Sequence, residues 1–209
     1  MTPSWPYHFL MSNQFILESL KSAQQTLNNF IENENNLVLI EKAIETFITT
    51  LKGDGRLMAC GNGGSMCDSM HFIEELTGRY RKDRDPISAI PMGDPGHITC
   101  VANDYGYEYI FSRNVQAWGR KGDTLLAIST SGNSENVIKA VEMAHQKGMK
   151  VVGLLGKSGG KLKDMVDVPL IVDCQVTDRI QEIHIKLIHI FIEGIERHIV
   201  PEHYTEEQA

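Results

Sequence analysis

The chain has 209 residues, a formal net charge of −7 and a hydrophobic content of 42%. This length suits one domain with a sizeable core, and the acidic balance without any Lys/Arg-rich block argues against a nucleic-acid-binding protein. No apolar run reaches the roughly 18 residues that a membrane span requires. The first ten residues lack the pattern of a secretory signal, so we expect a cytoplasmic protein with no membrane or nucleic-acid partner.

Two helices are predicted before residue 53. "FILESLKSAQQTLNNFI" (15–31) carries apolar residues at helical spacing, and "LVLIEKAIETFITTL" (37–51) does so more densely. The polar stretch "ENENN" separates them. Residues 1–11 contain two prolines and no periodicity, so we expect them to be disordered or an extension that precedes an initiator at Met11.

After Gly53 short β-rich runs alternate with helical stretches. The expected strands are 56–60, 87–91, 124–129, 150–155 and 168–172. The expected helices lie near 66–77, 97–118, 134–147 and 178–199. Strands separated by helices predict right-handed crossovers and a parallel sheet covered on both faces. We therefore expect one α/β domain over 12–200 with a helical N-terminal extension, followed by a tail at 201–209.

The stretch "CGNGGS" (60–65) follows the first predicted strand, where ligands bind in open α/β sheets. Gly61, Gly63 and Gly64 permit positive φ angles and close backbone approach, and Ser65 stands where a helix begins. The stretch matches neither the dinucleotide-binding pattern nor the Walker loop. The sequence of this stretch is compatible with two interpretations, a phosphate-binding turn and a turn that needs glycine only for its backbone conformation.

The stretch "STSGNSENV" (129–137) places four hydroxyls where a strand passes into a helix, from Ser129, Thr130, Ser131 and Ser134. A helix N-terminus offers free N–H groups and partial positive charge, so it binds an anion without Arg or Lys. The alternative is ordinary N-capping. A single cap explains one hydroxyl and not four, so the pattern favours a phosphate site.

Two further patterns place titratable groups on helices. His71 and Glu75 are four residues apart and share one helix face, which we expect at the carboxyl end of the first strand. The apolar neighbours indicate a largely buried helix, so Glu75 is a candidate general base rather than half of a solvated pair. "DRIQEIHIKLIHIFI" (178–192) is apolar nearly all round, yet it contains Gln181, His184 and His189.

Together, "CGNGGS…HFIEELTGRY", "ANDYG", "AISTSGNSENVIKA" and "DRIQEIHIKLIHI" resemble the phosphoheptose isomerases of the SIS domain superfamily. The resemblance implies a flavodoxin-like, five-stranded parallel sheet sandwiched by helices, in a homotetramer with active sites at subunit interfaces. It also implies conversion of sedoheptulose 7-phosphate to D-glycero-D-manno-heptose 7-phosphate through an enediol. That is the first step of ADP-heptose synthesis for lipopolysaccharide. Met66 is a departure, since close relatives often carry another small or polar residue there.

The resemblance also implies the roles of individual residues. The catalytic pair would be Glu75 and His189, and one zinc ion per subunit would be bound by His71, Glu75, Gln181 and His189. Besides Glu75, the substrate contacts would be Asn62, Gly63, Gly64, Ser65, Asn103, Asp104, Ser129, Thr130, Ser131, Ser134, Asp178 and Gln181. Because the last helix looks too apolar to face water, we expect a neighbouring subunit to cover it. We then expect His189 to meet the Glu75 of another chain.

Three other functions compete with this interpretation. A non-catalytic SIS module would lack the glutamate and the last histidine of the pair, and both are present here as Glu75 and His189. An isomerase of another sugar phosphate, such as arabinose 5-phosphate, stays open. A regulatory sugar-phosphate sensor would usually bring a DNA-binding segment, and we find none in the sequence.

Overall fold

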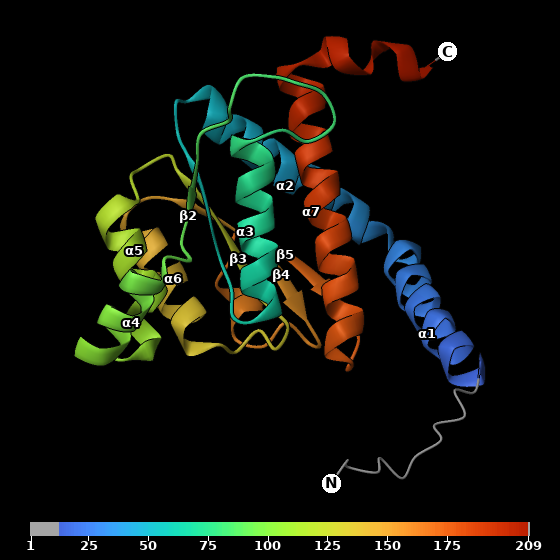
Figure 1. Ribbon diagram of the computed structural model, residues 1–209, viewed down its shortest axis with the longest axis horizontal. Helices are drawn as coiled ribbons and strands as arrows, with labels where there is room; N and C mark the ends of the chain where they lie inside the picture. Colours follow the sequence, from blue (N-terminus) through green and yellow to red (C-terminus); the bar gives the residue numbers. More distant parts are fainter. Residues whose placement is uncertain (1–12, 209) are drawn as a thin grey trace, which may run out of the picture.

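The computed structural model describes residues 13–208, so our expectation for residues 1–11 lies outside its scope. Within that range a five-stranded sheet has the order β2-β1-β3-β4-β5, and every neighbouring pair is parallel. The strands are β1(Leu57–Cys60), β2(Ala89–Pro91), β3(Thr124–Ser129), β4(Lys150–Gly156) and β5(Val168–Val172). This is the flavodoxin-like order, so the predicted α/β fold with a parallel sheet is confirmed (Figure 1).

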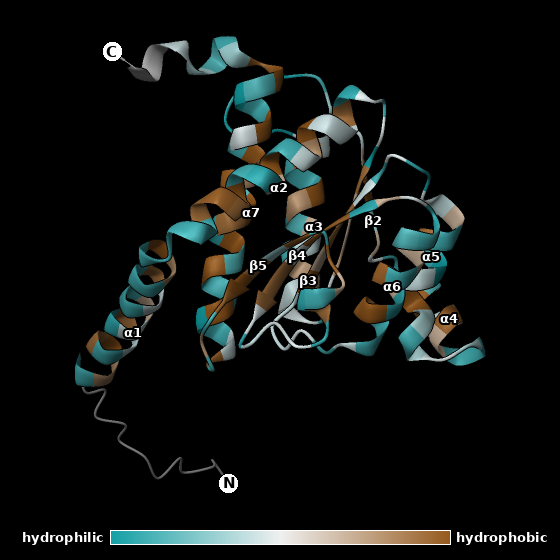
Figure 2. Ribbon diagram, turned by 180° about the vertical axis from the view of Figure 1, so that it is seen from behind, coloured by the Kyte–Doolittle hydropathy of each residue, from teal (hydrophilic) through white to brown (hydrophobic). Residues whose placement is uncertain are grey.

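Helices cover both faces of the sheet. One face packs against α2(Glu34–Lys52), α3(Gly64–Thr77) and α7(Thr177–Ile199), and the other against α4(Pro95–Asp104), α5(Ile110–Trp118) and α6(Glu135–Gln146). Side chains along β1 alternate between the two cores: Leu57 faces the first core and Met58 the second. All four β1 residues are buried, which explains why the sequence of this strand is a continuous apolar run. The hydrophobic colour on β4 and β5 in Figure 2 shows the same character in the middle of the fold.

The helical stretch predicted over 97–118 is interrupted. The helix α4 ends at Asp104, and Gly106 follows with a φ of 110°. A short turn, η1(Tyr107–Tyr109), then leads into α5. Glycine adopts this left-handed backbone without a Cβ penalty, which breaks the helix although the apolar spacing continues through it.

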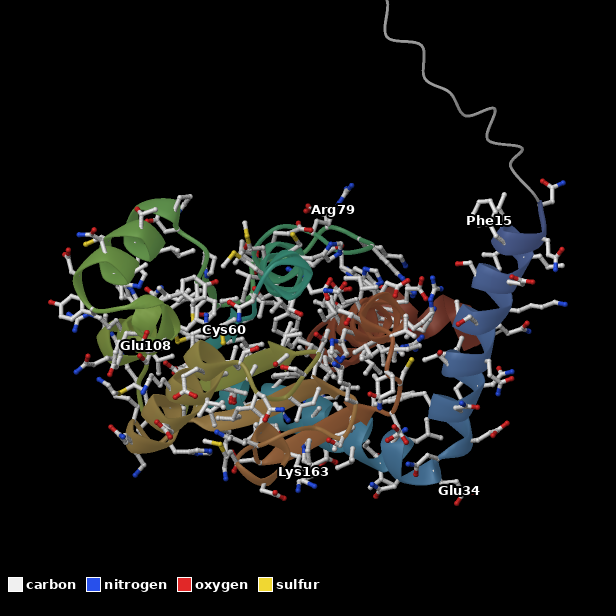
Figure 3. All side chains as sticks on the ribbon, turned by 90° about the horizontal axis from the view of Figure 1, so that it is seen from below. Phe15, Glu34, Cys60, Arg79, Glu108 and Lys163 are labelled. Carbon is white, nitrogen blue, oxygen red and sulfur yellow. The ribbon has the colours of Figure 1, made fainter. Side chains whose placement is uncertain are left out.

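The first helix, α1(Asn13–Glu32), leads away from the α/β body (Figures 1 and 3). Phe30 is its buried residue, whereas Phe15, Leu17 and Leu20 are 49%, 52% and 65% exposed. Large apolar side chains are thus exposed along α1. None of the helices within 13–208 has both the length and the apolar character that crossing a membrane requires.

We expected the last long helix to be apolar on nearly every side, and that expectation is wrong. That a neighbouring subunit covers its outer face stays a prediction. Its apolar residues Ile180, Leu187 and Phe191 are buried against the rest of the same chain. Glu182 and Lys186 are exposed and form part of a charged outer face. After α7 the chain continues into the short helix η3(Pro201–Gln208).

Candidate active site

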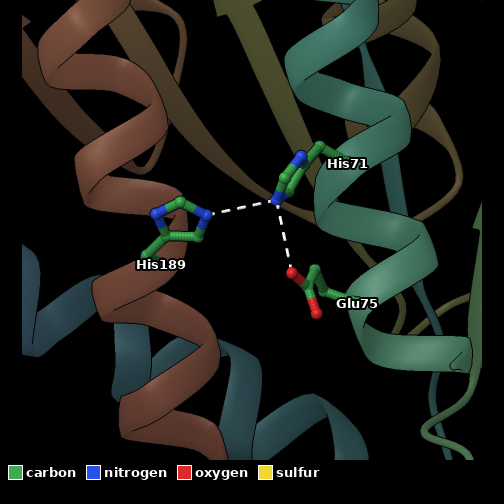
Figure 4. Close-up of side chains that lie close together, drawn as sticks. All are labelled: His71, Glu75 and His189. Atoms are coloured by element: carbon green, nitrogen blue, oxygen red, sulfur yellow. Dashed lines mark hydrogen bonds and ion pairs between the residues drawn. The ribbon is translucent and has the colours of Figure 1, made fainter. Parts of the chain in front are cut away.

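Helices α3 and α7 lie side by side and run in the same direction, and three predicted site residues meet between them (Figures 1 and 4). The Nε2 atom of His71 is 3.1 Å from Nε2 of His189 and 3.4 Å from Oε1 of Glu75. One donor atom from each residue lies within 4.8 Å of the others. The spacing of four residues places His71 and Glu75 on one side of α3, as predicted.

This arrangement corrects two expectations from the sequence. We expected Glu75 and His189 to come from different chains, whereas a single chain brings both of them to His71. We also expected the pair at the carboxyl end of the first strand. His71 instead lies seven residues beyond Gly64 on α3, which is about 10 Å along the helix axis. The cluster therefore lies between two helices rather than at the edge of the sheet.

Burial and neighbouring charges shift the pKa values of the candidate acid–base pair. Burial raises the pKa of Glu75, as does the charge of Glu74, while His71 acts in the opposite direction. Burial lowers the pKa of His189, and the neighbouring His71 adds to that effect. The two pKa values move toward one another, so the transfer of a proton between this carboxyl group and this imidazole costs less free energy.

The donor atoms fit a zinc ion. Two imidazole nitrogens bound to one tetrahedral zinc would lie about 3.3 Å apart, given Zn–N distances of about 2.0–2.1 Å. The separation between His71 and His189 is 3.1 Å, and Glu75 supplies an oxygen donor beside them. Gln181 lies two turns before His189, against Gly64, where a Cβ on the glycine would collide with its amide. Its role as a fourth ligand therefore stays a prediction.

The backbone conformation and the close packing at the start of α3 require glycine. Gly63 precedes the helix with a φ of 56° and no side-chain cap from the described residues. A Cβ on Gly61 would meet the backbone of Ser65, and Gly64 makes room for Gln181. The turn thus requires glycine whether or not it binds an anion. Substrate contacts from Gly63, Gly64 and Ser65 remain predictions.

The serine loop, residues 129–134, ends β3 and begins α6. The hydroxyl of Ser129 lies 3.0 Å from that of Ser134 and 3.4 Å from that of Ser131. Ser134 occupies the N-cap position of α6, but within the described chain its hydroxyl makes no capping hydrogen bond. Ordinary N-capping therefore does not explain Ser134. The hydroxyls gather at a helix N-terminus, as an anion site requires.

An asparagine pair joins the two loops. Asn62 and Asn136 each donate a side-chain N–H to the other's oxygen, at 2.8 Å in both directions. The hydroxyl of Tyr107 also donates to Asn62, at 3.0 Å. These residues line a cavity of about 560 Å³ together with Ser134 and Lys139, beside β1 and β3, where the strand order reverses. Sequence reasoning missed Asn136 and Tyr107, although each lies within or next to a quoted motif.

The other predicted contacts lie apart from the His71 cluster. Asn103 and Asp104 are exposed at the end of α4 and bond to each other at 2.7 Å. Asp104 lines a neighbouring cavity of about 530 Å³. Asp178 pairs with Arg179 at 2.9 Å in the first turn of α7. The side chain of Thr130 is half-buried in the serine loop. The described structure does not bring Asn103, Asp104 or Asp178 into contact with the His71 cluster.

Comparison with known proteins identifies the family. The SIS domain family matches residues 19–156. The chain is 53% identical over 192 residues to the phosphoheptose isomerase of Fusobacterium nucleatum, covering 92% of this chain and 99% of that protein. The chain belongs to the phosphoheptose isomerase family. Solved phosphoheptose isomerases from Neisseria gonorrhoeae and Francisella tularensis are 38% and 35% identical to it, with TM-scores of 0.83 and 0.85. The matches cover 88% and 90% of this chain, and 98% and 100% of those chains.

Membership of the phosphoheptose isomerase family decides between an enzyme and the two non-enzymatic functions considered from the sequence. The family consists of enzymes, so neither a non-catalytic SIS module nor a regulatory sensor accounts for these matches. The His71 cluster agrees with that assignment, because it supplies the acid–base groups that an isomerase needs.

Proposed function

We propose that this protein isomerises sedoheptulose 7-phosphate to D-glycero-D-manno-heptose 7-phosphate at the His71 cluster between α3 and α7. The observation that carries the proposal is the meeting of His71, Glu75 and His189 in one chain of a phosphoheptose isomerase. An aldose–ketose isomerase needs a base near the C1–C2 bond and a group that moves protons between the two oxygens. The cluster offers a carboxylate for the first task and imidazoles for the second.

In this mechanism Glu75 removes a proton from C1 of the ketose, which leaves an enediol. His189 gives a proton to O2 and accepts one from O1, and Glu75 then delivers a proton to C2. The raised pKa of Glu75 and the lowered pKa of His189 suit this exchange. We propose His71, Glu75, Gln181 and His189 as the residues that would hold zinc. A proton carried by Glu75 or His189 would then occupy the atom of that side chain that does not bind the metal. A bound zinc ion would supply Lewis-acid polarisation of a sugar oxygen.

We propose that the serine loop holds the phosphate. Its support is the convergence of the Ser129, Ser131 and Ser134 hydroxyls at the N-terminus of α6. The remaining proposed sugar contacts are Asn62, Gly63, Gly64, Ser65, Asn103, Asp104, Thr130, Asp178 and Gln181. Both polar atoms of Asn62 already bond to protein groups, which leaves one amide hydrogen for the sugar.

We propose further that the protein acts as a cytoplasmic homotetramer, with each active site at a subunit interface. The exposed apolar residues of α1 support assembly, as do Met70 and Ile190, which are 46% and 39% exposed and adjoin His71 and His189 in sequence. Light scattering should give four times the chain mass of 23.4 kDa. A monomer at micromolar concentration would contradict this proposal. The cytoplasm is the compartment in which free sugar phosphates accumulate.

The test of function is conversion of sedoheptulose 7-phosphate by the purified protein, with and without a metal chelator. A parallel assay with arabinose 5-phosphate tests the competing substrate. We expect the heptose aldose to form, and zinc to restore any activity that the chelator removes. No conversion by zinc-supplied protein would contradict the proposed function, and faster conversion of arabinose 5-phosphate would reassign the substrate.

A further inference from the structure

Arg84 forms a buried ion pair near the His71 cluster. It lies in the segment between α3 and β2, and its Nε donates to Oε1 of Glu196 on α7 at 2.7 Å. Both side chains are only 1% exposed. A buried charge that lacks a partner is costly, so each residue holds the other in place.

The same guanidinium holds the end of α3. One terminal nitrogen of Arg84 donates to the backbone oxygen of Glu75 at 2.6 Å, and the other donates to that of Leu76 at 2.9 Å. Carbonyls in the last turn of a helix lack partners within the helix, so Arg84 caps the turn that carries Glu75. Arg84 thus binds the proposed base, Glu75, directly through the backbone oxygen of that residue.

The carboxylate of Glu196 connects this cap to α7. Glu196 lies two turns beyond His189 on that helix, and its Oε2 accepts a hydrogen bond from the hydroxyl of Tyr204 at 2.7 Å. Tyr204 belongs to η3 and is 6% exposed. Burial, with help from Glu196, raises the pKa of Tyr204 above its usual range, so the phenol stays a donor. We call Arg84, Glu196 and Tyr204 the Arg84 network.

We propose that Arg84 is a positioning residue for the isomerase reaction, which fixes the last turn of α3 against α7 and thereby sets Glu75 relative to His189. This inference rests on the proposed function. The planar guanidinium reaches the Glu196 carboxylate and two carbonyls at once, and a lysine ammonium cannot reproduce that geometry. A displacement of about 1 Å at reacting groups can cost about 10²-fold in rate.

The test compares Arg84→Lys with a matched control, Arg56→Lys. Arg56 also pairs with a buried carboxylate, that of Asp123 at 2.8 Å, and it also donates to a backbone oxygen, that of Trp118 at 2.5 Å. It precedes β1, at the end of the sheet opposite the serine loop. Both substitutions should lower the melting temperature. Because Arg56 is 17% exposed and Arg84 only 1%, the loss of kcat is compared relative to the loss of stability in each variant.

For Arg84→Lys we expect kcat to fall by about 10–10²-fold while KM changes less than about twofold, because the phosphate is held elsewhere. We expect zinc affinity, measured by chelator competition without substrate, to fall by about tenfold, as for other groups that orient metal ligands. Arg56→Lys should leave both quantities within about twofold of wild type.

The inference is overturned if folded Arg84→Lys keeps wild-type kcat and zinc affinity, or if Arg56→Lys loses as much kcat for the same loss of stability. If Arg84→Lys does not fold, Tyr204→Phe carries the test, since it removes one hydroxyl from the Arg84 network. It should lower kcat several-fold with KM unchanged, and wild-type kcat would refute the inference. An inactive wild-type protein would instead refute the proposed function.

Discussion

Replacing Glu75 with glutamine removes the proposed base and preserves the size of the side chain. In the structure Oε1 of Glu75 lies 3.4 Å from Nε2 of His71, and the side chain is 16% exposed, which leaves little room for water to replace the base. Turnover should therefore fall by about 10²–10⁴-fold. This corresponds to about 2.7–5.5 kcal/mol of activation free energy.

The same substitution should not destabilise the metal-free protein. Because the fold raises the pKa of Glu75, its stabilising contribution is present below the unfolded-state pKa and is lost as the pH rises through the folded-state value. At neutral pH the ionised carboxylate is thus unfavourable in the folded state, and a neutral amide avoids that cost. In the presence of chelator, Glu75→Gln should melt at the same temperature as wild type or higher.

Two measurements on one preparation test this reasoning: the rate of aldose formation and the melting temperature with chelator. The exposed neighbour Glu74 provides the control, because Glu74→Gln makes the same chemical change one residue away and should keep turnover within a few-fold. If Glu75→Gln retains a tenth of wild-type turnover, Glu75 is not the base. Lost turnover together with a large fall in melting temperature would indicate a structural role.

Three more predictions follow from the site and its surroundings. Ser131→Ala and Ser134→Ala should each weaken substrate binding by about 1–2 kcal/mol, seen as a higher KM in steady-state kinetics, and unchanged affinity in the double variant would exclude the serine loop as the phosphate site. Mixtures of Glu75→Gln and His189→Ala subunits should stay inactive after subunit exchange, because both residues act from one chain, and recovered activity would show that they act across chains. Burial lowers the pKa of His184 to about 4, so the unfolded chain binds the proton first as the pH falls, and stability is lost from about pH 6.5 to 4. Denaturant titrations of His184→Gln should show less of this loss, by up to about 3 kcal/mol, and identical pH profiles would contradict the assignment.

The strands of the sheet could be predicted from the sequence because strands buried on both faces are continuous apolar runs. All six residues of "TLLAIS" are buried, and no polar face interrupts the run. The break between α4 and α5 could not be predicted in the same way. Apolar residues keep their helical spacing across Gly106. The helix breaks there because Gly106 has a φ of 110°, and hydrophobic periodicity does not predict a backbone angle.

Only those contacts of the site that join residues close together in the sequence could be predicted. Helical spacing alone places His71 beside Glu75, whereas the contact between His71 and His189 joins residues 118 positions apart and depends on how α3 packs against α7. For the same reason the sequence misassigned Glu75 and His189 to different chains. Arg84 also escaped notice, because its partner Glu196 is 112 positions away and each alone resembles an ordinary surface charge.

Isomerisation in heavy water tests the central claim most directly, since it follows the proton that Glu75 is proposed to carry. An enediol mechanism with a side-chain base exchanges that proton with solvent, so the aldose formed by wild-type protein should contain deuterium at C2. Glu75→Gln should form neither the labelled aldose nor exchanged ketose at a comparable rate. Labelled aldose or exchanged ketose formed by Glu75→Gln at the wild-type rate would contradict the proposed role of Glu75.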